Sequence, residues 1–199
     1  MGGSIHLNSQ YQSEQGLSAQ IGRSQASFNN HATQFALQYG KRLRNQWQFS
    51  SNTHVMIGKV NNAFSEIERR GYLMSVAHAD RKSFIQDFFL HSNRNQTLSA
   101  HIWLSDNNAV LQPYLVHARE KTHTKAYRTM LKYSTGSWEA RVSWMRDILN
   151  YGKGDYTTMS LATTDKIGAQ VTVEWDGNWG SKVAYAFRSG AEVTHVATR

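Results

Sequence analysis

The chain has 199 residues and no cysteine, so it has the length of one domain and excludes disulfides and thiolate metal sites. Its formal net charge of +8 and pI near 9.8 favour polyanionic partners such as acidic polysaccharide, nucleic acid or lipid head groups. No run of about 18 apolar residues occurs, which excludes a transmembrane helix.

The beginning of the chain shows no targeting segment. Residues 1–20 lack the apolar run that a signal peptide requires. Met1, Gly2, Gly3 and Ser4 are interpreted as a cloning remnant ahead of a mature sequence. We therefore expect residues 1–199 to form a single domain.

Alternating apolar and polar residues predict β-strands along the chain. Apolar side chains recur at every second position in residues 17–22, 33–39, 98–104, 138–144 and 169–175. Proline occurs once in the chain, which suits a sheet whose backbone amides are nearly all paired. These patterns predict an all-β protein, an antiparallel meander of about 10–12 strands.

Four polar segments carry turn signals between the predicted strands. They are residues 40–45, 105–108, 134–137 and 176–178. The last contains Asp176-Gly177, and this dipeptide supplies the positive φ angle that a tight hairpin needs. We expect each segment to connect two adjacent antiparallel strands.

Three segments carry helical spacing instead. Residues 61–70 and 80–91 place aromatic and aliphatic side chains three or four positions apart. Residues 141–151 fit a helix as well as a strand, and Gly152 suits a helix end. A soluble α+β domain is therefore an alternative to the all-β prediction.

The polar face of the predicted strands carries fully charged residues. A water-filled barrel interior accepts such residues, while the apolar face meets lipid. The best prediction is thus a closed transmembrane β-barrel with a polar, net-basic lumen. The predicted lumen-lining residues are Glu139, Arg141, Glu174, Lys182, Arg188 and His101.

Aromatic residues collect beside the predicted turns. Trp and Tyr favour the membrane–water boundary, although aromatic pairs also stabilise hairpins directly. The predicted interface aromatics are Tyr39, Trp47, Tyr133, Trp138, Trp175 and Trp179.

Residues 35–49 and 131–144 resemble the strand–periplasmic turn–strand units of porin-like outer-membrane β-barrels. The resemblance implies a bacterial outer-membrane location, membrane lipid as a partner, and a channel, export or structural role. The basic charge extends this expectation to anionic solutes or acidic polysaccharide. Such barrels usually end on an aromatic residue, whereas this chain ends Val196-Ala197-Thr198-Arg199, so a truncated barrel or another class of protein stays open.

The main alternative is a soluble β-barrel or sandwich, secreted or periplasmic, that binds a small ligand or a polyanion. Nucleic-acid binding is not favoured, because the aromatic residues do not form one platform surrounded by basic residues. The nucleotide-binding, zinc-protease and serine-hydrolase motifs are absent, so no cofactor or metal is predicted. The oligomeric state is left open.

An enzyme is the second alternative. His91-Ser92-Asn93 resembles the His-x-Ser-Asn pattern of outer-membrane lipid hydrolases. In those enzymes the His and Ser are two residues apart and share one face of a strand. Here His91 and Ser92 are adjacent and would face opposite sides, so they are catalytic candidates that depart from the pattern.

Overall fold

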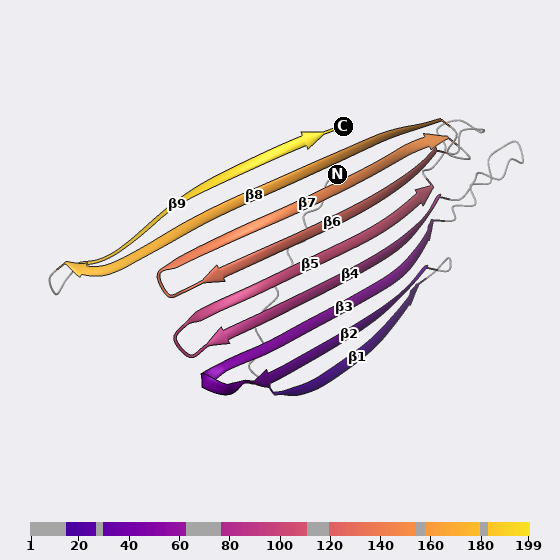
Figure 1. Ribbon diagram of the computed structural model, residues 1–199. Coiled ribbons are helices and arrows are strands. Elements are labelled where there is room, and N and C mark those ends of the chain that lie inside the picture. The colour runs from indigo at the N-terminus through magenta and orange to yellow at the C-terminus, as the bar shows by residue number, and fades with distance from the viewer. Residues whose placement is uncertain (1–14, 27–29, 63–76, 111–119, 154–157, 180–182) are drawn as a thin grey trace, which may run out of the picture.

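The computed structural model describes residues 15–26, 30–62, 77–110, 120–153, 158–179 and 183–199. These residues form one antiparallel sheet of nine strands, each beside its neighbours in the sequence (Figure 1). The predicted all-β meander is confirmed, although fewer strands are described than expected. The strands are β1 (Gly16–Ala26), β2 (Asn30–Arg42), β3 (Trp47–Asn62), β4 (Ala77–Ser92), β5 (Gln96–Val110), β6 (Glu120–Ser134), β7 (Trp138–Lys153), β8 (Thr158–Trp179) and β9 (Val183–Thr198).

The helical interpretation is wrong for two of the three segments. Residues 80–91 lie within β4, and residues 141–151 lie within β7. Phe84 and Phe88 are four positions apart, a spacing that shares one face in a helix and in a strand alike. Residues 61–62 end β3, and the remainder of the segment 61–70 lies outside the described residues. The α+β alternative therefore loses its support.

Two of the four turn predictions are also wrong. Residues 105–108 lie inside β5, and residues 176–178 lie inside β8. The other two are correct: residues 134–137 connect β6 to β7, and residues 40–45 include the end of β2 and part of the 3-10 turn η1 (Arg44–Gln46). The strands are longer than their apolar stretches, so polar residues that looked like turns continue the hydrogen-bonded ladder.

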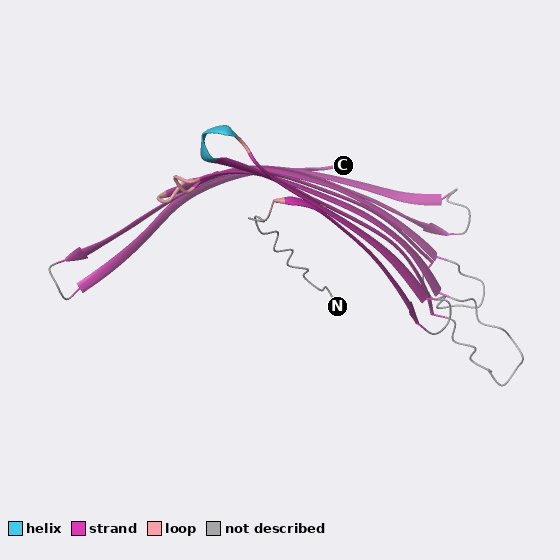
Figure 2. Cartoon of the chain, turned by 90° about the horizontal axis from the view of Figure 1, so that it is seen from below, coloured by secondary structure: helices cyan, strands magenta, loops and turns pink. Residues whose placement is uncertain are grey.

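Side chains from all nine strands sort into two faces, because the register is continuous in each of the eight pairings. One face carries His54, Asp87, His101 and Arg141, and the other carries Phe35, Phe88 and Val142. The first group belongs to the set of side chains that line a cavity reaching from β3 to β9. We call their face the concave face and the opposite one the convex face, since the sheet arches around one side (Figure 2).

The described strands form a single layer with almost no enclosed apolar core. Phe89, which is 6% exposed, is the one buried hydrophobic side chain among the described residues. By contrast, Ile21 is 80% exposed and Val193 is 73% exposed. No second sheet packs on the described one, so these residues do not form the sandwich of the soluble alternative. β1 and β9 form the two edges of the described sheet.

The connections differ between the two ends of the sheet. At one end, short turns connect β2 to β3, β4 to β5 and β6 to β7. Gln46 and Asn95 adopt positive φ angles of 65° and 56° in two of them, which allows the chain to reverse within a few residues. The connections at the other end include residues 63–76 and 111–119, which lie outside the described residues. We refer to these as the short-turn end and the loop end.

No helix of the described chain has the length and the apolar character needed to cross a membrane.

A glycine in β9 allows close pairing with β8. A Cβ atom at Gly190 would lie 2.9 Å from the carbonyl oxygen of Val171, so the Gly190→Ala variant must shift the backbone of one strand. We expect it to destabilise the fold by about 1–3 kcal/mol, measured by thermal unfolding with far-UV circular dichroism. Gly22→Ala is the matched control, because no heavy atom lies within 4 Å of its added Cβ. Equal stability of the two variants would contradict the prediction.

Candidate functional site

The concave face holds the predicted lumen residues that the structure describes. Glu139 and Arg141 lie on β7, His101 on β5, Glu174 on β8 and Arg188 on β9, and the register places all of them on this face. Lys182 lies outside the described residues. The predicted lumen residues were each assigned from the alternation within one strand, and those that the structure describes share one face of the sheet.

The concave face carries nearly as many acidic as basic residues in the described strands, and the net-basic lumen stays a prediction. Several of these charges are paired across strands. Lys132 lies 2.7 Å from Glu139, Arg188 lies 3.2 Å from Glu174, and Arg128 lies 3.4 Å from Asp147. The register places eight basic residues on this face, Arg42, Arg81, Arg128, Lys132, Arg141, Lys153, Lys166 and Arg188, and seven acidic residues, Asp87, Glu120, Glu139, Asp147, Glu174, Asp176 and Glu192.

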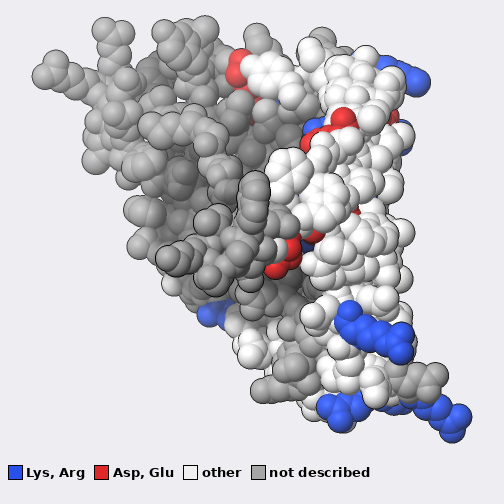
Figure 3. All heavy atoms as spheres, turned by 90° about the vertical axis from the view of Figure 1, so that its left-hand side faces the viewer, with Lys and Arg blue, Asp and Glu red and all other residues white. Residues whose placement is uncertain are grey.

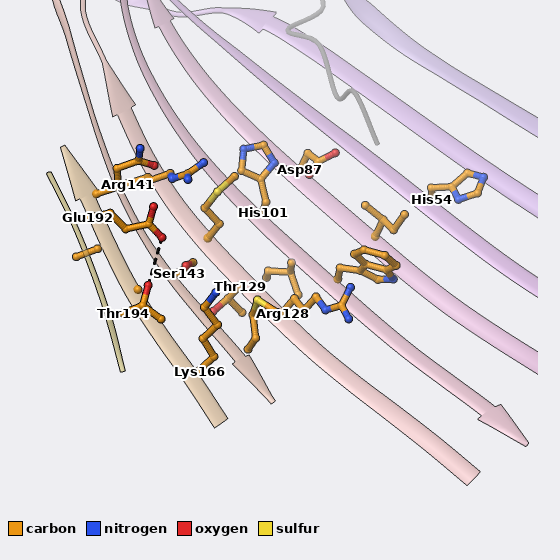
Figure 4. A pocket seen from close by; sticks show the side chains of 18 residues that line it. His54, Asp87, His101, Arg128, Thr129, Arg141, Ser143, Lys166, Glu192 and Thr194 are labelled. Atoms are coloured by element: carbon orange, nitrogen blue, oxygen red, sulfur yellow. Dashed lines mark hydrogen bonds and ion pairs between the residues drawn. The ribbon is translucent and has the colours of Figure 1, made fainter. Parts of the chain in front are cut away.

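A cavity of about 680 Å³ lies on the concave face. Its wall combines apolar side chains, such as Ile85, Met130 and Met145, with charged ones (Figure 4). This combination suits a ligand or a passing solute with both polar and apolar parts, because the apolar groups supply contact area and the polar ones fix its orientation.

Two basic residues of the cavity wall are free to meet an anion. Arg141 and Lys166 form no ion pair with any described carboxylate, whereas Glu192 accepts a hydrogen bond from Thr194 at 3.2 Å. Figure 4 shows Arg141 and Lys166 on neighbouring strands of the same wall. The local charge of the cavity therefore favours anions, although the acidic and basic residues of the described face are nearly equal in number.

Unused hydrogen-bond donors lie in the same wall. The guanidinium of Arg128 stacks 4.6 Å from the ring centroid of Trp103, which is a cation–π contact. The Trp103 Nε1 and Arg128 Nε atoms are buried, and neither finds a hydrogen-bond partner among the described residues. A bound acceptor group would satisfy donors that otherwise carry a desolvation cost.

Three side chains at one side of the cavity form a hydrogen-bonded series. Nδ1 of His101 lies 2.7 Å from Oδ1 of Asp87, and Nε2 of His101 lies 2.9 Å from Oγ of Ser99. An ionised carboxylate only accepts hydrogen bonds, so the neutral imidazole carries its proton on Nδ1. Nε2 then accepts the hydrogen bond that the Ser99 hydroxyl donates.

Two members of this series are buried. Ser99 is 4% exposed and Asp87 is 6% exposed. The ring of Phe89 meets the imidazole of His101 edge to face, with centroids 5.4 Å apart. His101 and Asp87 also line the cavity. The series is therefore held rigidly and adjoins the space that a ligand would enter.

The catalytic pairing of His91 with Ser92 is not formed. Nδ1 of His91 lies 2.8 Å from Oγ1 of Thr97, and the Ser92 hydroxyl accepts a hydrogen bond from the amide of Arg94 at 3.3 Å. Adjacent strand residues face opposite sides, as their spacing indicated.

Sequence reasoning missed Ser99, Asp87, Arg128 and Lys166. A signal existed for Ser99, because Ser99 and His101 are two positions apart on a predicted strand and so share a face. Asp87 had no such signal, since its proximity to His101 depends on the register between β4 and β5.

The described interface aromatics lie on the convex face near the short-turn end. Two pairs of rings pack across hairpins. The ring centroids of Tyr133 and Trp138 are 5.1 Å apart, and those of Trp175 and Phe187 are 5.6 Å apart. Tyr39 packs on Phe49 with centroids 6.3 Å apart, and Trp47 begins β3. Trp179 is the last residue of β8, at the same end. Hairpin packing thus accounts for Tyr39, Tyr133, Trp138 and Trp175, and the boundary position stays a prediction.

Within the described residues, no group of three or more His, Cys, Asp or Glu side chains is placed to hold a metal ion. Comparison with protein-family models, with characterised proteins and with solved structures gives no match.

Proposed function

We propose that this chain forms the wall of a bacterial outer-membrane β-barrel whose polar interior passes or holds anionic solutes or acidic polysaccharide. One observation carries the proposal: nearly all of the large exposed apolar side chains of the described strands lie on the convex face. The exceptions in the strands are Leu149, Tyr151 and Val196, toward the loop end of the concave face. An apolar surface this extensive is unfavourable in water and favourable in lipid.

The apolar surface has a defined height. On β8 it runs from Ile167 to Trp175, about 27 Å along a strand at ~3.4 Å per residue. At the usual tilt of ~40° this is about 21 Å along the membrane normal, close to the ~25 Å apolar band of such barrels. Figure 3 shows a broad area of uncharged side chains with lysine and arginine at its edges.

Charged residues mark the upper limit of this band on the convex face. Toward the loop end, the outward positions change from apolar to charged on most strands, and Arg146 pairs with Asp165 there at 2.7 Å. Such a margin suits the level of lipid head groups, whose phosphates attract basic side chains. The marginal residues are Arg23, Lys59, Lys82, Asp106, Lys125, Arg146 and Asp165.

Three polar side chains within the band hydrogen-bond to one another. Gln86 on β4 accepts a hydrogen bond from Thr53 at 2.6 Å and donates one to Ser51 at 2.8 Å. The register places these three residues on the convex face. Mutual satisfaction of this kind is what a hydrocarbon environment requires of polar groups.

Closure of the barrel requires further strands. In a nine-strand meander β1 and β9 run in the same direction, so pairing them directly would be parallel. Bacterial single-chain barrels close with antiparallel neighbours and an even number of strands. Under this proposal, an odd number of additional strands completes the wall between β9 and β1.

The first test is folding with and without detergent micelles. We expect a β-type circular dichroism spectrum only in detergent, with an unheated band on an SDS gel that shifts on heating. The physical reason is that the convex face needs an apolar environment. A β spectrum and a monodisperse protein in plain buffer would overturn the proposal in favour of a soluble binding protein.

The second test uses two neighbouring residues on opposite faces. Val142 is 55% exposed on the convex face, and Ser143 lines the cavity on the concave face. Val142→Arg should destabilise the folded protein in lipid by about 2–4 kcal/mol, as for a lipid-facing charge near the midplane. Ser143→Arg should cost less, because its charge meets water. Equal effects in a urea titration in lipid vesicles would oppose the assignment of the faces.

The third test concerns the charge of the interior. Replacing Arg141 and Arg188 by Glu should shift the reversal potential in planar bilayers toward cation selectivity. Of the two single variants, Arg141→Glu should shift the reversal potential more than Arg188→Glu. Arg188 is already paired with Glu174, whereas Arg141 forms no ion pair in the described strands. Reversal potentials unchanged in the double variant would exclude selectivity by these residues.

A further inference from the structure

We propose that Ser99, His101 and Asp87 form a serine-hydrolase site that cleaves carboxylic esters from the concave face. Ser99 would be the nucleophile, His101 the general base and acid, and Asp87 a positioning residue. This activity goes beyond a barrel wall and does not depend on it, since the three reacting side chains lie on two paired strands, β4 and β5.

The geometry has the two hydrogen bonds that such chemistry needs. The nucleophile contacts the base at 2.9 Å, between Oγ of Ser99 and Nε2 of His101. The base contacts its positioning group at 2.7 Å, between Nδ1 of His101 and Oδ1 of Asp87. Both distances lie within the range of about 2.6–3.2 Å expected for an activated nucleophile. Opposite ring nitrogens serve the two partners, so one tautomer supports the whole series.

The local sequence holds this geometry in place. Ser99 and His101 are two positions apart on β5, so both side chains leave the strand on the concave face. Asp87 lies directly opposite His101 in the register of β4 and β5. Phe89 packs on the imidazole from the same side of β4, which restricts its rotation.

The surroundings suit an ester with an anionic or strongly polar part. Lys132 lies directly opposite Ser99 in the register of β5 and β6, and Arg141 lies directly opposite Lys132 on β7. The Lys132 ammonium, which also pairs with Glu139 at 2.7 Å, would stabilise the negative charge that develops on the carbonyl oxygen. Arg141 and Lys166 in the cavity wall would hold an acidic group of the same substrate.

The reaction proceeds by acyl transfer and then hydrolysis. Oγ of Ser99 forms a bond to the ester carbonyl carbon as Nε2 of His101 takes the hydroxyl proton. The carbon–oxygen bond to the alcohol then breaks, and His101 gives that proton to the departing alcohol. A water molecule next attacks the acyl-serine, its proton passing through His101 to Ser99 as the carboxylic acid leaves. Asp87 stabilises the imidazolium that forms in each half.

The test uses the full chain, folded as in the gel-shift experiment, with p-nitrophenyl acetate as the substrate and a fluorophosphonate as the covalent probe. We expect the probe to label the peptide that contains Ser99. Ser99→Ala and His101→Gln should each lower the hydrolysis rate at least about a hundredfold, because general-base catalysis contributes about 10²–10⁴. Ser92→Ala should leave labelling and rate unchanged, since the Ser92 hydroxyl accepts a hydrogen bond from the amide of Arg94 and lies on the convex face, away from His101.

Asp87 is tested by conservative replacement. Asp87→Asn should lower the rate, and Asp87→Glu should recover part of it, because a carboxylate is what stabilises the imidazolium. A purely structural role would not distinguish these variants when both fold equally well by the gel shift.

A thiol variant covers the case in which Ser99→Ala fails to fold. Ser99→Cys should react with iodoacetamide at least about tenfold faster than Ser143→Cys, because a neighbouring imidazole activates the thiol. Wild-type protein that folds but shows no labelling at Ser99 would overturn the proposal, as would Ser99→Cys reacting no faster than Ser143→Cys. Either result leaves the barrel proposal standing, because folding in detergent is measured separately.

Discussion

The unbroken antiparallel ladder is the constraint on which the rest of the structure depends. Each of the eight pairings keeps its register without an interruption between its first and last partners. Side chains therefore alternate between faces in step from β1 to β9, and every apolar or charged position is assigned to one face by parity alone. A shift of one residue in the register of β5 would move His101 to the convex face and Leu104 to the concave face.

Fold class was predictable from sequence because the alternation is strong in the apolar part of each strand, such as Leu98 to Leu104 in β5. The ends of the strands were not predictable from sequence. β5 and β8 extend through Asp106 and Asp176, and aspartate commonly occurs in turns. Backbone pairing with a neighbouring strand outweighs local turn preference there. The mistaken helix at residues 80–91 has a different cause: a spacing of four is common to both kinds of periodicity, and only the cross-strand partners of Phe84 and Phe88 distinguish them.

The candidate site was predictable only in part. Charges such as Arg141 and Glu139 could be assigned to a polar face from their own strand, since this needs no knowledge of neighbours. The net charge of that face could not be predicted, because it depends on which residues of all nine strands share the face. The series from Asp87 to Ser99 needed both kinds of information: spacing within β5 and register with β4. His91 and Ser92 are adjacent and face opposite sides, whereas Ser99 and His101 have the spacing of two that places both side chains on one face.

The meander also determines how the chain can assemble and change. Each of the nine described strands pairs with its sequence neighbours, and short turns connect β2 to β3, β4 to β5 and β6 to β7 at one end. Closing a short loop costs little chain entropy, so these hairpins can form early, each as a local unit. A hairpin inserted or lost between two existing hairpins would change the size of the sheet while leaving the partners of the other strands intact. The loop end, where connections such as residues 63–76 join successive hairpins, is then the place where length can vary most freely.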